Sequence, residues 1–105
     1  MPIKQFAAAT MLINYTTDTF TSLVKLLNFI ETNKTIGAGM RWLDRYEAFL
    51  HKKFLNAEYI KLCNNSIFYN LSLRCIYYND CLIAFSVEEQ PVIIEAIVHK
   101  SRIID

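Results

Sequence analysis

Two apolar segments of strand length, separated by a short polar turn, limit the folds open to this chain more than any other feature. Residues 81–87 read Cys-Leu-Ile-Ala-Phe-Ser-Val, and residues 92–99 read Val-Ile-Ile-Glu-Ala-Ile-Val-His. Between them, residues 88–91 (Glu-Glu-Gln-Pro) have the composition of a turn. We therefore predict two adjacent antiparallel strands, of which the first is an apolar central strand.

A third strand is predicted at residues 67–78, just before this pair. Every second residue from Ile67 to Tyr77 is apolar or aromatic, which is the period of a half-buried strand. The dipeptide Asn79-Asp80 then supplies a turn. The C-terminal half is accordingly predicted to form a three-stranded antiparallel sheet.

The N-terminal half predicts one short strand and two helices. Residues 11–15 (Met-Leu-Ile-Asn-Tyr) have strand character, and Thr17 or Asp18 is suited to cap the helix that follows. Apolar residues recur at helical spacing up to about residue 33 and again over residues 36–54. The sequence thus predicts two helices joined by a short turn.

The predicted order is β, α, α and then three antiparallel strands. This is an α+β fold in which a two-helix hairpin packs on a C-terminal antiparallel sheet. A chain of 105 residues has room for one core, so we expect a single domain over residues 11–105. Residues 1–10 are expected to be an extension ahead of an alternative start at Met11, either loosely ordered or added to a sheet edge.

The charge balance argues against a function that depends on many phosphate contacts. The chain has 11 basic and 10 acidic residues, a net charge of +1, whereas proteins that grip RNA or DNA usually carry a clear basic excess. A protein partner fits this balance at least as well as a nucleic acid. The sequence contains no Gly-rich phosphate loop, no His-Glu-x-x-His motif and no His and Cys at metal spacing, so it implies no cofactor and no metal.

Hydropathy and cysteine spacing predict a cytoplasmic protein without a membrane segment. No apolar run approaches the roughly 18 residues needed to span a bilayer, and no cleavage-like site follows the short apolar stretch at the start. Cys63, Cys75 and Cys81 form no C-x-x-C pair. We expect these cysteines to be buried and reduced rather than disulfide-bonded or bound to a metal.

Strand periodicity predicts a polar strip on the face of the sheet that the helices leave uncovered. Alternate residues from Val92 to Val98 are predicted to face the helices, which places Glu95 and His99 on the open face. The same alternation places Arg74 there. In a functional interpretation His99 is a general base.

Each residue of this strip also has a structural interpretation. Arg74 and Glu95 suit a surface ion pair, which contributes only about 0–1 kcal/mol. His99 alone is more often a hydrogen-bonded structural residue than a base. Lys100 and Arg102, after the last strand, are either a solvated end or part of a binding surface.

The C-terminal motifs resemble those of the RelE/ParE toxin family. They are the pair Leu73-Arg74, the strand at residues 81–87, and residues 92–102 with the ending His99-Lys100-Ser101-Arg102. Members of that family carry an aromatic-Arg or Leu-Arg pair, a strand of the form Y-x-I-x-Y-R-V and a closing strand of the form V-L-H-x-x-R-D. The helical hairpin before the sheet also fits, so the resemblance spans residues 11–102.

The resemblance implies the toxin of a bacterial type II toxin–antitoxin pair, held inactive by a small cognate antitoxin. It leaves a homodimer and a monomer open for the free toxin. RelE-like members cut messenger RNA on the ribosome, whereas ParE-like members bind and poison DNA gyrase. The residues that the resemblance implies in target or antitoxin binding are Arg74, Glu95, His99, Lys100, Ser101 and Arg102. Arg74 and His99 are also the catalytic candidates if the chain is an enzyme.

Three positions depart from the pattern of the RNase members. Ser86 stands where Y-R-V carries its arginine, Phe85 replaces the neighbouring tyrosine, and Leu82 stands where RNase members often carry another arginine. An RNase must activate the ribose 2′-OH, stabilise a charged phosphorane and protonate the leaving oxygen, and few cationic groups remain for this. The sequence favours a toxin directed at gyrase or another protein. The alternatives are a ribosome-dependent mRNA endonuclease and a non-toxic member that acts as a protein-interaction module.

Overall fold

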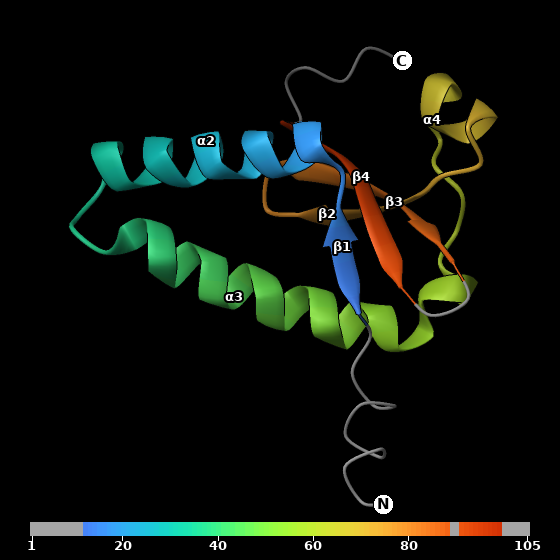
Figure 1. Cartoon of the computed structure of the whole chain (residues 1–105), viewed down its shortest axis with the longest axis horizontal. Helices are drawn as coiled ribbons and strands as arrows, with labels where there is room; N and C mark the ends of the chain where they lie inside the picture. The colour runs from blue at the N-terminus through green and yellow to red at the C-terminus, as the bar shows by residue number, and fades with distance from the viewer. Residues whose placement is uncertain (1–11, 89–90, 100–105) are drawn as a thin grey trace, which may run out of the picture.

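The computed structural model describes residues 12–88 and 91–99 as an α+β arrangement of one four-stranded mixed sheet and several helices (Figure 1). The predicted order of β, α, α, β, β, β is present, with a 3-10 helix and a short α-helix inserted after the hairpin. The extension predicted for residues 1–10 lies outside the described residues. The elements are β1 (Ile13–Tyr15), α2 (Thr17–Asn33), α3 (Ala38–Lys53), η1 (Phe54–Tyr59), α4 (Ser66–Asn70), β2 (Arg74–Tyr78), β3 (Cys81–Val87) and β4 (Val92–His99).

The four strands lie in the order β1-β4-β3-β2. β2, β3 and β4 are antiparallel, as predicted, whereas β1 runs parallel to β4 with Ile13 opposite Val92. The chain passes directly from β1 into α2. Thr16, rather than the predicted Thr17 or Asp18, caps α2, because its side chain accepts a hydrogen bond from the backbone N–H of Thr19.

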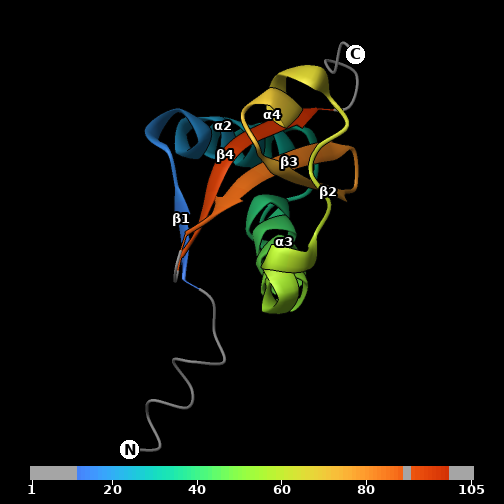
Figure 2. The ribbon, with the colours of Figure 1, turned by 90° about the vertical axis from the view of Figure 1, so that its right-hand side faces the viewer.

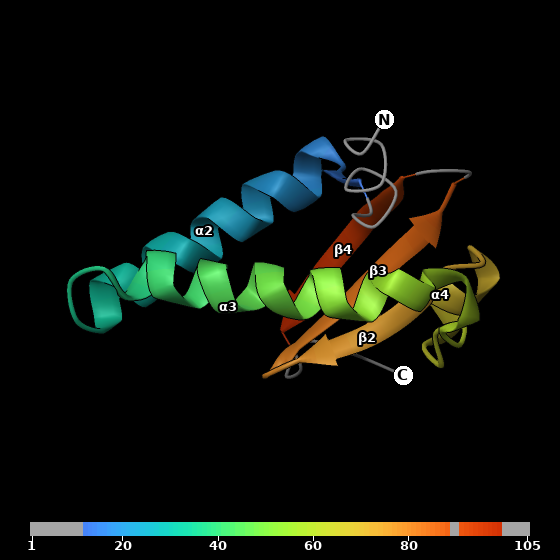
Figure 3. The same ribbon diagram turned by 90° about the horizontal axis from the view of Figure 1, so that it is seen from below.

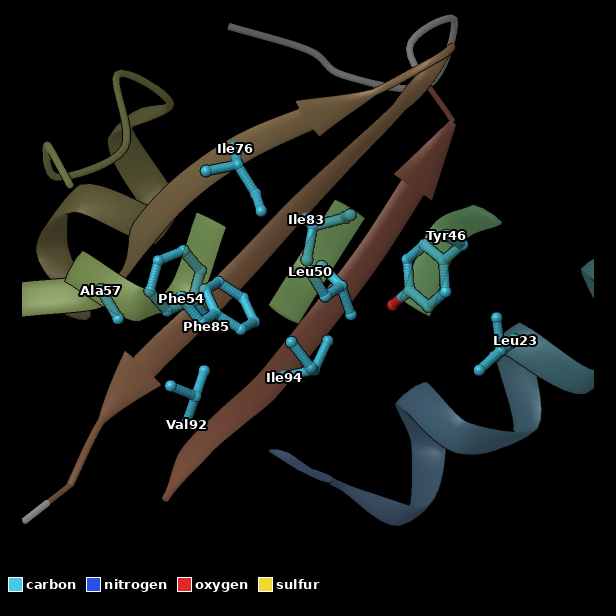
Figure 4. Close-up of a cluster of buried hydrophobic side chains, with 10 residues drawn as sticks. All are labelled: Leu23, Tyr46, Leu50, Phe54, Ala57, Ile76, Ile83, Phe85, Val92 and Ile94. Atoms are coloured by element: carbon cyan, nitrogen blue, oxygen red, sulfur yellow. The ribbon is translucent and has the colours of Figure 1, made fainter. Parts of the chain in front are cut away.

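The two long helices bury their apolar sides against one face of the sheet. Leu23 of α2 and Tyr46 and Leu50 of α3 belong to the same buried cluster as Phe54 and Phe85 (Figure 4). Tyr46 and Leu50 are four residues apart and so lie along one side of α3, and Phe54 follows at the start of η1. The rings of Phe54 and Phe85 are 4.7 Å apart. This core holds α3 across the strands, as Figure 3 shows.

Glu31, near the end of α2, holds the start of α3. Its Oε2 accepts a hydrogen bond from the N–H of Gly37 at 2.7 Å, and its Oε1 accepts one from the N–H of Gly39 at 2.9 Å. These bonds occupy free N–H groups of the helix N-terminus and hold the pKa of Glu31 below its usual value. Gly37 has a φ of +85°, and a Cβ on Gly39 would lie 2.9 Å from the Leu27 carbonyl oxygen. Both glycines are therefore required by the tight hairpin.

The strand predicted at residues 67–78 is correct only in its second half, where β2 lies. Its first half is α4, on the opposite side of the sheet from α3 (Figure 2). The side chain of Asn65 accepts hydrogen bonds from the backbone N–H groups of Ile67 and Phe68, at 3.0 and 3.1 Å. This local cap starts a helical turn in a segment whose alternation is typical of a strand.

A β-bulge interrupts the pairing of β3 with β4. Ala84 lies opposite Ala96, whereas Phe85 lies opposite Ile94, so Glu95 is an extra residue on β4. An extra residue shifts the register and reverses which side chains point to which face beyond it.

The bulge makes the predicted faces wrong for the second half of β4. Val92 is buried in the cluster under the helices, as predicted. After the bulge, Ile97 packs against that cluster, whereas Ala96 packs against a second cluster on the other face. His99, two residues after Ile97, shares its face. The predictions that Ala96 faces the helices and that His99 lies on the open face are therefore wrong.

Cys63 and Cys75 form a disulfide bond, which corrects the prediction that all three cysteines are reduced. Backbone hydrogen bonds bring the two residues together: the N–H of Cys63 donates to the Leu73 carbonyl at 2.9 Å, and the N–H of Cys75 donates to the Lys61 carbonyl at 3.4 Å. The pairing depends on the chain reversal through α4, which the sequence pattern did not predict. Cys81 is free and buried, as predicted.

Candidate functional site

Arg74 lies at the start of β2 and supports the segment that follows η1. Its guanidinium donates a hydrogen bond to the Ile60 carbonyl, and its backbone forms a bridge with Leu62. In the sheet it lies opposite Phe85, whose ring belongs to the cluster under the helices. Because residues opposite each other share a face, Arg74 lies on the helical side of the sheet. The prediction that it lies on the open face is wrong.

Glu95 accepts hydrogen bonds at both its backbone carbonyl and its side-chain carboxylate. Its carboxylate Oε2 accepts a hydrogen bond from Ser86 Oγ at 3.0 Å, and its backbone carbonyl accepts one from Thr19 Oγ1 at 2.8 Å. Ser86 is next to Phe85 and so points to the open face, where Glu95 was also predicted to lie. The predicted ion pair with Arg74 does not occur, since each side chain is bonded to other groups.

The register of the sheet separates Arg74 from His99. Arg74 lies opposite Phe85 and His99 lies opposite Cys81, four positions apart along β3. Four residues of a strand span about 13 Å, and the two strand spacings between β2 and β4 add about 10 Å across the sheet. The predicted strip is therefore not assembled, and Arg74 and His99 do not converge on one group. Lys100, Ser101 and Arg102 follow His99 but lie outside the described residues.

The bulge instead places His99 in a concavity between α2 and the end of the sheet. Its volume is about 500 Å³. Residues of α2 that lie three and four positions apart, and so on one side of the helix, form one wall; β3 and β4 form the other. The polar side chains in this lining are Ser22, Lys25 and His99, and the remaining members are Leu26, Phe29, Cys81 and Ile97.

Cys81 contributes apolar surface to this concavity rather than a nucleophile. Burial, reinforced by the carboxylate of Asp80, raises the pKa of the Cys81 thiol. The thiolate is the reactive form of cysteine, so a raised pKa leaves the group protonated and unreactive at neutral pH. The concavity is suited to hold an apolar side chain whose polar neighbours reach Lys25 and His99.

Sequence reasoning identified His99 but missed the residues of α2 that surround it. Ser22, Lys25 and Phe29 lie on the flank of α2 beside its apolar side, and nothing in their spacing indicates which strand they meet. That contact depends on the β-bulge and on the packing of α2 against β4. Within residues 12–88 and 91–99, no three His, Cys, Asp or Glu side chains lie close enough together to hold a metal ion.

No model of a known protein family matches the sequence, and no curated protein is similar to it. In the described part of the chain, no helix combines the length and the apolar character needed to cross a membrane. The assignment of a function therefore depends on the arrangement of elements and on the residues of the site.

Proposed function

We propose that this chain is the toxin of a bacterial type II toxin–antitoxin pair, that it binds a protein target such as DNA gyrase, and that a cognate antitoxin neutralises it. The order β, α, α, β, β, β supports this proposal, with the α2–α3 hairpin on one face of the sheet. These are the elements that the resemblance of residues 11–102 to RelE/ParE toxins implies.

The separation of Arg74 from His99 is the observation that favours a protein target over cleavage of RNA. An RNase needs cationic and acid–base groups gathered around one phosphate. Here the guanidinium of Arg74 is bonded to the Ile60 carbonyl, and His99 lies opposite Cys81 at the other end of β3. The concavity beside His99, with its apolar lining and protonated thiol, favours binding over covalent chemistry.

The pair Ser86 and Glu95 supports the same choice. Ser86 stands where RNase members carry an arginine, and its hydroxyl donates to the carboxylate of Glu95 at 3.0 Å. A carboxylate at this position repels the scissile phosphate of RNA rather than stabilising it. This part of the open face is therefore unsuited to phosphoryl chemistry.

Expression of the chain alone in a bacterial host tests the proposal. We expect growth to stop, the DNA-damage response to be induced, and growth to recover when the small reading frame next to the gene is co-expressed. Rapid loss of messenger RNA without DNA damage would instead identify the RNase. Normal growth in cells that contain the folded protein would contradict a toxin of either kind.

A pair of histidine variants tests the role of the concavity. His99→Ala is expected to weaken the growth arrest, because His99 lines the proposed binding site. The matched control is His51→Ala, which removes the other histidine from an exposed position near the end of α3. If both variants arrest growth as strongly as the parent chain, the concavity has no part in target binding.

A further inference from the structure

The turn end of the α2–α3 hairpin extends past the sheet and carries a second concavity, distinct from the one beside His99. Figures 1 and 3 show the hairpin reaching beyond the strands at this end. The concavity has a volume of about 410 Å³. Three cationic side chains, Lys34, Arg41 and Arg45, line it together with the indole of Trp42.

Local contacts hold two of these groups in place before any partner arrives. The guanidinium of Arg41 donates to Thr35 Oγ1 at 2.7 Å and to the Ile36 carbonyl at 3.2 Å. The indole of Trp42 stacks on Tyr46 with ring centroids 5.1 Å apart, and it meets Tyr78 edge to face at 5.4 Å. A side chain that is already ordered loses little conformational entropy when it binds.

The lining of this concavity contains three cationic side chains and no carboxylate. Lys34 and Arg45 form no ion pair with any described residue. The carboxylate of Glu31 interacts electrostatically with Arg41 alone among these three cations, and both its oxygens accept hydrogen bonds from Gly37 and Gly39. Those bonds also occupy the N–H groups at the start of α3, so an incoming anion meets the side-chain cations rather than the helix end.

We infer that this concavity binds an acidic amphipathic segment of a partner protein. Carboxylates of the partner pair with Lys34, Arg41 and Arg45, of which Arg41 and Arg45 lie one helical turn apart on α3. An apolar side chain of the partner packs on the apolar part of the lining, which consists of Ile30, Ala38 and Trp42. The inference stands apart from the proposed function, since it concerns a different surface and does not require the chain to be a toxin.

The apolar groups favour a protein over a nucleic acid as the partner. Ile36, whose carbonyl anchors Arg41, has a side chain that is 92% exposed, and Ile30, Ala38 and Trp42 add further apolar surface. Phosphates would engage the cations but would leave this surface uncovered. The affinity of phosphate contacts also grows with their number, and this site offers three cations in a chain with a net charge of +1.

The chain contains one tryptophan, so its fluorescence reports on this site alone. We would titrate the full chain with a helical peptide of about five turns that has leucine on one face and glutamate on the other. Trp42 emission is expected to change saturably, and binding is expected to weaken as salt rises from about 50 to about 500 mM. A peptide with lysine in place of glutamate is expected not to bind.

Two variants connect the binding to the named cations. Lys34→Gln and Arg45→Gln, both at exposed positions, are each expected to lower the affinity for the glutamate peptide about fivefold. They should also reduce quenching of Trp42 by iodide relative to caesium, since the local positive potential attracts the anion. Lys52→Gln is the matched control, because it removes the same charge from an exposed position at the other end of α3.

Three results would overturn the inference: no response of Trp42 to the glutamate peptide, unchanged affinity in both variants, or tighter binding of single-stranded or duplex RNA or DNA. The binding assay tests this inference and the growth assay tests the proposed function, so each hypothesis can be contradicted without the other. Growth arrest without peptide binding contradicts this inference alone, whereas peptide binding without growth arrest contradicts the proposed toxin alone.

Discussion

Thr19 Oγ1 donates a 2.8 Å hydrogen bond to the backbone carbonyl of Glu95, 76 positions later in the chain. Glu95 is the bulged residue of β4, and Thr19 lies in the first turn of α2 with only 3% of its surface exposed. The contact therefore joins the start of the helical hairpin to the irregularity that turns His99 toward α2. Its loss would leave the half-buried Glu95 without this partner for its carbonyl.

Replacement of Thr19 by valine tests this contact. Thr19→Val keeps the shape of the side chain and removes both the donor to Glu95 and the acceptor of the 2.7 Å hydrogen bond from Thr16 Oγ1. The free energy of unfolding is therefore expected to fall by about 1–3 kcal/mol. Thr19→Ser retains the hydroxyl and is expected to recover much of that loss. Chemical denaturation of both variants measures the difference. The exposed Thr21→Val is the control, and equal stability of Thr19→Val and Thr21→Val would show that the bond contributes nothing.

The carboxylate of Glu31 is expected to make stability depend on acid pH. Its pKa is lowered in the folded chain, first by the N–H of Gly37 and next by that of Gly39. A lowered pKa means that the stabilisation is present above the unfolded value of about 4.3 and is lost as pH falls through the folded value. Glu31→Gln should therefore be less stable than the parent at pH 7.

The difference between Glu31→Gln and the parent should shrink as the pH is lowered below about 4.3, when measured by denaturant unfolding at each pH. Glu58→Gln removes the same charge from an exposed position of η1 and serves as the control. A constant difference at every pH would mean that the charge of Glu31 is not what holds the start of α3.

Two tyrosine variants should differ although they remove the same hydrogen bond. Tyr15 Oη donates to Tyr46 Oη at 3.1 Å, and Tyr46 is fully buried whereas Tyr15 is half-buried. Tyr15→Phe removes the partner of a buried hydroxyl and is expected to cost about 1–3 kcal/mol in the free energy of unfolding. Tyr46→Phe leaves the more accessible hydroxyl and is expected to cost less. The reverse order would contradict this account.

The same two tyrosines should make stability fall at alkaline pH. Burial raises the pKa of both hydroxyls above the ordinary value of 10.0. A raised pKa gives stabilisation that is complete below the unfolded value and is lost as pH rises above it. Denaturant unfolding between neutral pH and the alkaline range is expected to show this fall, and Tyr46→Phe should make it shallower. An equal fall in the variant would assign it to other groups.

The Cys63–Cys75 disulfide should determine both the number of reactive thiols in the chain and its loss of stability on reduction. Three cysteines with one bond leave one thiol, that of Cys81, so a thiol-reactive dye should label one site per unfolded, unreduced chain. Closing a loop of this size stabilises a fold by up to about 3 kcal/mol, and reduction is expected to remove that amount. The variant that carries both Cys63→Ser and Cys75→Ser should be insensitive to reductant. Three reactive thiols in the unreduced chain would contradict the bond.

Local sequence patterns were sufficient to predict the segments that form regular strands and helices. The alternation and turns of residues 67–99 predicted three antiparallel strands, which the structure confirms from residue 74 onward. Helical spacing predicted α2 and α3 within two residues of their ends. They failed at α4, because the Asn65 cap competes with a strand pattern. They also failed for Ala96 and His99, since period-two reasoning assumes a regular ladder and Glu95 breaks it.

By itself, the sequence determined the order of the four strands and the two long helices, the apolar sides of those helices and the polar residues at the end of the last strand. Those properties depend on neighbours within a few positions. Only the tertiary structure decided that Arg74 lies far from His99, that Cys63 meets Cys75, and that α2 forms a wall beside His99. Each of these depends on register and on hydrogen bonds between distant segments, such as Thr19 with Glu95, and no short-range periodicity encodes them.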